Sequence, residues 1–297
     1  MSDGVIIEAA INGATTKARN PHVPITEDEI VADALACFEA GAAIVHHHIA
    51  GSGRSGADAA EVYLGVWRRV LAERPDALWY PTINIGPSAG WYDHIAPLAA
   101  SGMLRMSLSD PGSVNLGGRT DGVPSGRFVY ANSFDDIARQ LQLCRDHRLG
   151  PSIAIYEPGF LRAVLAHQQA GTLPAGAFVK LYLSADRGLT GAPFGLPPTV
   201  TALAAYLELL EGSGLVWAVS AVGDDLVRTE VCRAALDLGG HLHVGLEFYG
   251  GDRTPTNAEL VTEAAEACAA AGRPVATCDE AATILGLPRT APSTVAS

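Results

Sequence analysis

The chain lacks runs of lysine or arginine, and its formal net charge is −12. Nucleic acids and anionic membrane surfaces bind basic patches, so neither is expected as the main partner. No stretch approaches the roughly 18 uninterrupted apolar residues of a membrane span. The first residues contain neither a basic region nor a long apolar segment of the kind that directs secretion. These absences favour a cytoplasmic protein that acts on a small molecule.

Closely spaced cysteine pairs are also missing. No CxxC pair occurs, and the five cysteines are scattered along the chain. Four of them lie within helix-like stretches, where a reduced cysteine packs as a small apolar residue. We therefore expect free packing residues rather than disulfides at Cys37, Cys144, Cys232, Cys268 and Cys278.

Linkers and low-complexity segments are absent before the tail that starts at Thr290, and 48% of the residues are hydrophobic. That apolar content is sufficient for one large packed core. We predict a single domain over residues 1–289, followed by a flexible tail over residues 290–297.

Eight short β-rich runs alternate with helix-like segments. This alternation predicts a (β/α)8 barrel of the TIM type, and capping-box patterns at Thr26 and Ser133 support the helix starts. An open doubly wound sheet is the alternative. It normally needs a glycine-rich phosphate turn after the first strand, and residues 12–16 do not form one. The predicted strands span residues 5–12, 43–49, 78–85, 104–109, 152–157, 178–184, 216–222 and 241–247.

Two long connections follow predicted strands and are rich in glycine and proline, over residues 110–132 and 185–198. In a barrel, the loops that follow the strands build the site. We therefore expect both connections to shape a substrate pocket.

Three consecutive histidines end the second predicted strand. Because side chains alternate along a strand, His46 and His48 share one face and His47 points to the other. Glu247 ends the eighth strand, and two histidines with one glutamate form an open ligand set for zinc. The carboxyl ends of barrel strands converge on one basin, so we expect the three side chains to lie close together. A chance cluster, a solvated strand end and structural imidazoles are the alternatives.

Other strand ends carry polar side chains that suit the chemistry of an open metal site. A bound metal polarises a carbonyl or water, as in acyl transfer, hydration or carbon–carbon cleavage beside a ketone. Thr82 and Ser107 are candidate donors to a substrate oxygen, with loop capping as the alternative. Glu157 is a candidate general base, a hydrogen-bond acceptor that supports a site residue, or a helix cap. His243, one layer below the carboxylate on the same strand face, is either a partner of the site or a core imidazole.

Several segments resemble the β-keto acid cleavage enzymes, the family of 3-keto-5-aminohexanoate cleavage enzyme, over residues 6–287. The most specific stretches are residues 12–14 (Asn-Gly-Ala), 20–21 (Asn-Pro), 24–26 (Pro-Ile-Thr), 39–42 before the His46/His48 pair, and 239–247. Residues 217–219, 256–261 and 276–285 add weight to the resemblance.

The resemblance implies a zinc-dependent (β/α)8 barrel, usually a homotetramer. Such an enzyme cleaves a β-keto acid with acetyl-CoA to give acetoacetate and a new acyl-CoA, and zinc holds the keto acid and polarises its carbonyl. Carried over by position, the zinc ligands are His46, His48 and Glu247, and the hydroxyl donors near the metal are Thr82 and Ser107.

The chain departs from the family pattern at charged positions. His243 stands where the family has an arginine, and Phe248 stands where it has the aspartate thought to drive proton transfer. Two acidic positions linked to an aminated substrate are also lost, near Thr15 and at Ala154. A non-aminated substrate is therefore expected, and a changed reaction is an open alternative.

Three side chains are candidates to compensate for these losses. They are Glu157 as a base, and Arg187 or Arg253 as an anchor for anionic groups of the coenzyme. The expected activity is metal-dependent acyl transfer between a β-keto acid and acetyl-CoA. A metal-dependent lyase or hydrolase that uses no CoA ester, and a barrel that binds a keto acid without converting it, are the alternatives. The ligand set also suits divalent ions other than zinc.

Overall fold

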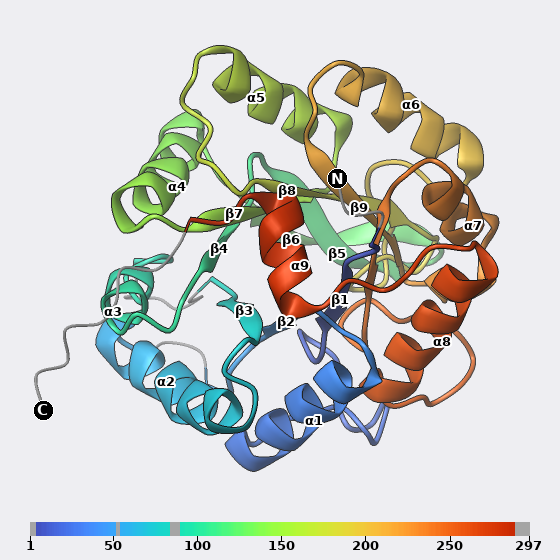
Figure 1. The fold of residues 1–297 in the computed structure, drawn as a ribbon. Helices are drawn as coiled ribbons and strands as arrows, with labels where there is room; N and C mark the ends of the chain where they lie inside the picture. Colours follow the sequence, from blue (N-terminus) through green and yellow to red (C-terminus); the bar gives the residue numbers. More distant parts are fainter. Residues whose placement is uncertain (1–3, 52–53, 84–89, 289–297) are drawn as a thin grey trace, which may run out of the picture.

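The computed structural model describes residues 4–51, 54–83 and 90–288, and within them eight parallel strands form a ring surrounded by helices (Figure 1). The strand order is β3, β2, β1, β10, β9, β8, β7, β4, and β3 lies beside β4. This cyclic order is that of a (β/α)8 barrel rather than a doubly wound sheet. The strands are β1 (Ile7–Ala10), β2 (Ile44–His47), β3 (Leu78–Pro81), β4 (Met106–Ser109), β7 (Gly150–Ile155), β8 (Phe178–Ser184), β9 (Val216–Val222) and β10 (His241–Val244).

The predicted fold and its eight strands are confirmed, with differences at strand ends. The strands over residues 178–184 and 216–222 have the predicted bounds, whereas the strand predicted over residues 78–85 ends at Pro81. Its last two predicted residues, and the tail predicted over residues 290–297, lie outside the described residues. No helix in the described part of the chain is both long and apolar enough to cross a membrane.

Both faces of the barrel strands are buried. In β8, Val179 and Leu181 are fully buried, while the alternate residues Lys180 and Tyr182 face a cavity inside the ring. The sequence of a strand that is covered on both faces is usually a nearly continuous run of apolar residues. A charged residue such as Lys180 inside such a run therefore marks a position that needs a partner within the barrel.

Helices surround the ring (Figure 1). The capping boxes predicted at Thr26 and Ser133 are present at the first turns of α1 and α4. All five cysteines are free and buried, as predicted. The helices are α1 (Glu27–Ala40), α2 (Gly56–Glu73), α3 (Ile95–Ala100), α4 (Phe134–His147), α5 (Pro158–Gln169), α6 (Val200–Leu210), α7 (Glu230–Asp237), α8 (Asn257–Ala270) and α9 (Cys278–Leu285), with a short 3-10 helix, η1 (Leu226–Arg228), before α7.

Helix α9 lies across the centre of the ring in Figure 1. The segment before it pairs with the start of the chain, since Val275 bridges Val5. The segment after it brings Leu287 against Gly150, where β7 begins, and against Gly176, just before β8. Helix α9 therefore covers the end of the barrel where the strands begin, and the opposite end is left for the site.

The connection over residues 110–132, predicted as a loop, contains an antiparallel hairpin. Its strands are β5 (Val114–Thr120) and β6 (Val123–Tyr130). Asp121 and Gly122 form the two-residue turn with positive φ angles of 51° and 80°. Such an Asp-Gly pair is a strong hairpin signal, but the glycines elsewhere in the segment favoured a loop. The hairpin was therefore missed.

Candidate active site

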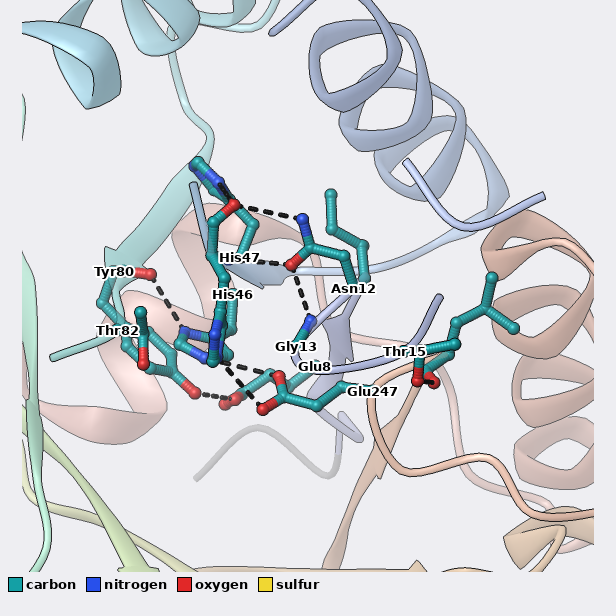
Figure 2. Close-up of polar contacts among 12 residues, drawn as sticks. Glu8, Asn12, Gly13, Thr15, His46, His47, Tyr80, Thr82 and Glu247 are labelled. Carbon is teal, nitrogen blue, oxygen red and sulfur yellow. Dashed lines mark hydrogen bonds and ion pairs between the residues drawn. The ribbon is translucent and has the colours of Figure 1, made fainter. Parts of the chain in front are cut away.

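Three potential metal ligands meet where the barrel strands end (Figure 2). His46 lies on β2, His48 follows this strand, and Glu247 follows β10. Nε2 of His46 lies 3.5 Å from Oε2 of Glu247, and Nε2 of His48 lies 3.1 Å from Oε1. One ligand atom from each residue lies within 4.8 Å of the other two. The barrel therefore brings together the three side chains that the sequence predicted as ligands.

Hydrogen bonding decides which nitrogen of His46 faces the carboxylate. Nδ1 lies 3.2 Å from the carbonyl oxygen of Tyr80, and a carbonyl only accepts, so Nδ1 carries the proton. Burial lowers the pKa of His46 well below its usual value, helped by the charges of His48 and Lys180, so the ring is neutral. The bare Nε2 and the carboxylate therefore present lone pairs to each other. Oε2 of Glu247 has no hydrogen-bond partner among the described residues. A divalent cation satisfies both groups, so the residues fit zinc.

His47 points to the other face of the strand, as predicted. Nε1 of Trp67 donates to Nε2 of His47 at 2.8 Å, and Nδ1 of His47 lies 3.1 Å from the carbonyl oxygen of His48. The ring packs among Tyr63, Trp67 and Trp79. Burial lowers the pKa of His47 to about 4. His47 is therefore a neutral packing residue between β2 and α2.

The loop after β1 supports the backbone on both sides of the candidate metal site. Oδ1 of Asn12 accepts from the N–H of His48 at 2.8 Å, and Nδ2 donates to the His48 carbonyl at 3.1 Å. Thr15 donates to the carbonyl of Leu246 at 2.7 Å, just before the candidate ligand Glu247. Partners of this kind orient metal ligands and conserve the geometry of the site.

A cavity of about 230 Å³ opens beside the three ligands. The hairpin contributes Phe128 and Tyr130 to its wall, and the connection over residues 185–198 contributes Leu189 and Thr190. Both long connections therefore shape the cavity, as predicted. Largely apolar walls keep water from reacting groups. Besides the three ligands, the ionisable side chains that line it are Asp110, Tyr130, Tyr156, Lys180 and Tyr182.

A buried polar network extends from the cavity into the barrel. Lys180 donates to Oε1 of Glu8 at 3.1 Å and to the hydroxyl of Tyr80, which itself donates to Glu8. Nε2 of His243 lies 3.2 Å from the same carboxylate oxygen, without the alignment of a hydrogen bond. Burial, and secondarily the charge of Lys180, lower the pKa of His243 well below its usual value. The charged pair at the centre is therefore Lys180 and Glu8, at 1% and 0% side-chain exposure.

A comparison with protein families identifies the chain. Residues 4–287 match the model of the β-keto acid cleavage enzymes. The chain belongs to this family. One member, 3-oxoadipate:acetyl-CoA acetyltransferase of Cupriavidus necator, is 28% identical, with 97% of this chain and 96% of the relative covered. Another, 3-keto-5-aminohexanoate cleavage enzyme of Fusobacterium nucleatum, is 27% identical over 97% of this chain and 99% of the relative.

Solved structures resemble this β-keto acid cleavage family member in fold. The apo structure of ObcA superposes with a TM-score of 0.69 at 16% identity. The match covers 91% of this chain and 66% of ObcA, so the chain spans about two-thirds of that longer protein. At this identity the likeness concerns the barrel fold alone.

The two predicted hydroxyl donors lie on opposite faces of the barrel wall. Thr82 lines the cavity. Ser107 does not, because alternation along β4 points Leu108 into the ring and Ser107 outward, beside Cys144 of α4. Asp110, two residues after Leu108, faces the cavity instead. The position of Ser107 therefore gives no support to its predicted role.

Glu157 and His243, predicted as catalytic, do not line the cavity either. Glu157 is the N-cap residue of α5, and its Oε1 accepts from the N–H of Gly195 at 2.9 Å. It thereby fastens the loop over residues 185–198. His243 packs between the rings of Tyr182 and Phe248, and Phe248 is the residue that lines the cavity.

The two predicted anion anchors differ in their partners. Arg253 is held by Asp225 at 2.8 Å and by Glu263 at 2.6 Å, and these hydrogen bonds raise its pKa. Arg187 is exposed and donates to the carbonyl of Gly250 at 3.1 Å. Among the described residues, Arg187 has no acidic partner, and it is therefore the better placed of the two to bind an anion.

Sequence reasoning missed three ionisable residues near the cavity of this family member. Glu8 and Lys180 each interrupt an apolar strand, and a charge in a strand buried on both faces indicates a paired or functional group. That signal was available for both residues. Asp110 follows β4 without such a pattern, and its position depends on the alternation of side chains along that strand.

Gly13→Ala is expected to lower zinc affinity by about 10–100-fold, the usual effect of disturbing a group that supports a metal ligand. Gly13 has φ +56°, and a Cβ there would lie 2.2 Å from Cγ of Glu247. The added methyl group must therefore displace the ligand. Zinc titration of the metal-free protein measures the effect.

Gly272→Ala is the matched control for that substitution. Gly272 also has a positive φ, +72°, but nothing lies within 4 Å of its Cβ position. The backbone strain is then similar in both variants, while the contact with Glu247 differs. Equal zinc affinity of the Gly13→Ala variant and the control would contradict the packing argument.

Proposed function

We propose that this protein is a zinc-dependent β-keto acid cleavage enzyme that transfers an acyl group between a β-keto acid and acetyl-CoA, giving acetoacetate and an acyl-CoA. The observation that carries this proposal is the meeting of His46, His48 and Glu247 at the wall of a largely apolar cavity, where the bare Nε2 of His46 faces Oε2 of Glu247. When bound by these three residues, zinc supplies a Lewis acid that polarises the keto acid carbonyl. The family's acetyl-CoA-dependent member supports the choice of co-substrate.

The chain's own residues position the keto acid. Lys180 places a positive charge at the cavity wall, where it attracts the substrate carboxylate. Thr82 supplies a hydroxyl group at the same wall. The side chain of Asn12 fixes the backbone of His48 through two hydrogen bonds. Ala154, at the place of a lost acidic residue, leaves the wall apolar there, which favours a non-aminated keto acid.

We place the anionic groups of acetyl-CoA near Arg187, with Arg19 as a second anchor. Arg187 donates to the carbonyl of Gly250 at 3.1 Å, and Arg19 donates to that of Tyr249 at 3.0 Å. Burial, and then the charge of Arg187, lower the pKa of Arg19, so the two cations are close. Neither has an acidic partner in the part of the chain that the structure describes. Two such guanidinium groups bind phosphate well.

A homo-oligomer, a tetramer by resemblance, and a cytoplasmic location complete the proposal. Large apolar side chains around the hairpin support association between copies, with Phe134 at 81% and Val123 at 64% exposure. Exposed apolar patches commonly mark interfaces. Light scattering of the purified protein tests the assembly by its mass.

The zinc-loaded enzyme is expected to convert β-keto acids only when acetyl-CoA is present. Chromatography of acyl-CoA products across a β-keto acid panel measures this. The Arg19→Ala/Arg187→Ala variant should raise KM for acetyl-CoA about 100-fold or more, because each of the two lost charge-assisted hydrogen bonds contributes roughly 1.5–3 kcal/mol. KM for the keto acid should not change. Arg68→Ala is the control, since Arg68 is exposed on α2.

Three outcomes would count against the proposal. Turnover without any CoA ester would indicate a lyase or hydrolase on the same scaffold. Binding of keto acids without turnover would indicate a barrel that only binds them. Equal acetyl-CoA KM values for the double arginine variant and the wild type would show that Arg19 and Arg187 do not bind the coenzyme.

A further inference from the structure

Asp110 is a buried carboxylate at the wall of the metal-site cavity, with 3% exposure. It follows β4, and its N–H donates to Oε1 of Gln140 at 2.8 Å. Its Oδ2 accepts a hydrogen bond from the hydroxyl of Tyr130. Its Oδ1 is buried and has no hydrogen-bond partner among the described residues. A buried carboxylate oxygen without a partner is costly, and such atoms often have a functional reason.

Several charged or ionisable groups surround Asp110. Burial raises its pKa to about 6, while the bond from Tyr130 and the charges of Lys180 and His48 oppose that rise and Glu247 adds to it. Tyr92 and Tyr156 also lie within electrostatic range. At neutral pH this carboxyl group is mostly ionised and can accept a proton.

The other ionisable groups of the cavity are less suited to accept a proton. His46, His48 and Glu247 form the ligand cluster. Lys180 is held by Glu8 and Tyr80. Burial raises the pKa of all three cavity tyrosines well above the usual value, so their hydroxyl groups stay protonated. Among the residues that the structure describes, Asp110 is the remaining base that lines the cavity.

We propose that Asp110 is the catalytic base of the reaction, an inference that rests on the proposed function. Oδ1 takes a proton from the carbon between the ketone and the carboxylate of the β-keto acid. The C–H bond breaks, its electron pair stays on the resulting enolate, and the proton forms an O–H bond on Asp110. After acyl transfer, the same proton returns to the corresponding carbon of the released acetoacetate, so no net proton is gained or lost.

Tyr130 is a positioning residue in this scheme. It comes from β6 of the hairpin and donates to Oδ2, while Oδ1 has no hydrogen-bond partner among the described residues. Its ring and that of Tyr156 pack in an edge-to-face arrangement, with centroids 6.1 Å apart. The hairpin thus orients the base as well as forming the cavity wall.

Exchange of the C2 protons of acetoacetate with deuterated water, followed by NMR on the zinc-loaded enzyme, tests the proposal directly. Asp110→Asn keeps the shape, the backbone bond to Gln140 and an acceptor for Tyr130, so it should fold. Exchange per bound acetoacetate should fall at least about 100-fold, in the range of general base catalysis. Tyr130→Phe should lower it less, about tenfold, as expected for one lost hydrogen bond to a charged group. Asp237→Asn, at an exposed residue of α7, should change nothing.

The outcomes separate this proposal from the proposed function. Exchange by Asp110→Asn within threefold of the wild type would overturn it, and so would no exchange by the wild type with acetoacetate bound. Weaker acetoacetate binding by Asp110→Asn with unchanged exchange per bound ligand would make Asp110 a recognition residue and overturn the base. Wild-type exchange without acetyl-CoA-dependent turnover would refute acyl transfer but retain Asp110 as the base.

Discussion

Glu247→Gln is expected to lower both zinc affinity and turnover by at least about 1000-fold, because a Lewis acid supplies several kcal/mol of charge stabilisation. The amide keeps the size of the carboxylate but lacks its charge. It can also donate a hydrogen bond to the bare Nε2 of His46, which in the native protein faces Oε2 at 3.5 Å. In the variant, an internal hydrogen bond between the introduced amide and His46 would therefore replace the contact for which the wild type needs a cation.

Mass spectrometry of metal content and the turnover assay measure this prediction. About one zinc per wild-type chain and almost none per variant chain is the expected result. Glu61→Gln is the control, because Glu61 is exposed on α2 and pairs with the exposed Arg68 at 3.7 Å. Full zinc content in the Glu247→Gln variant would contradict the proposed metal site and favour a structural role for His46 and His48. A His46→Ala/His48→Ala variant should then also keep its metal.

Lys180→Met is expected to lower the free energy of unfolding by about 3–5 kcal/mol, the usual effect of removing one partner of a buried ion pair. Glu8 is then left charged inside the barrel, and among the described residues the hydroxyl of Tyr80 is its remaining hydrogen-bond donor. Lys180 and Glu8 are almost completely buried, so water cannot replace the lost partner. Urea unfolding of the metal-free protein gives the free energy.

The chain provides its own control for this substitution. Lys17 is the only other lysine, and it forms an exposed pair with Glu29 at 2.7 Å. Lys17→Met should change stability by less than about 1 kcal/mol. Adding Glu8→Gln to Lys180→Met should recover part of the loss, because no charge is then left unpaired. If the double variant loses as much stability as the Lys180→Met and Glu8→Gln single variants together, the two residues contribute independently. That result would contradict the ion-pair argument.

The local pattern of the sequence was sufficient to predict the barrel and the three candidate metal ligands. Strands and helices alternate along the whole chain, and strand periodicity places His46 and His48 on one face whatever surrounds them. Glu247 could be added because the last strand of a barrel neighbours the first. These predictions needed only short-range periodicity and one topological rule.

Tertiary structure decided the surroundings of the ligands. The network that joins Glu8 to Lys180 connects residues 172 positions apart, and no local pattern relates them. The choice between Ser107 and Asp110 depended on which face of β4 turns inward, and a shift of one residue exchanges the two faces. The hydrogen bond from Tyr130 to Asp110 needed the hairpin. Periodicity is a property of neighbouring residues, whereas proton transfer and charge pairing depend on distances that only the closed barrel determines.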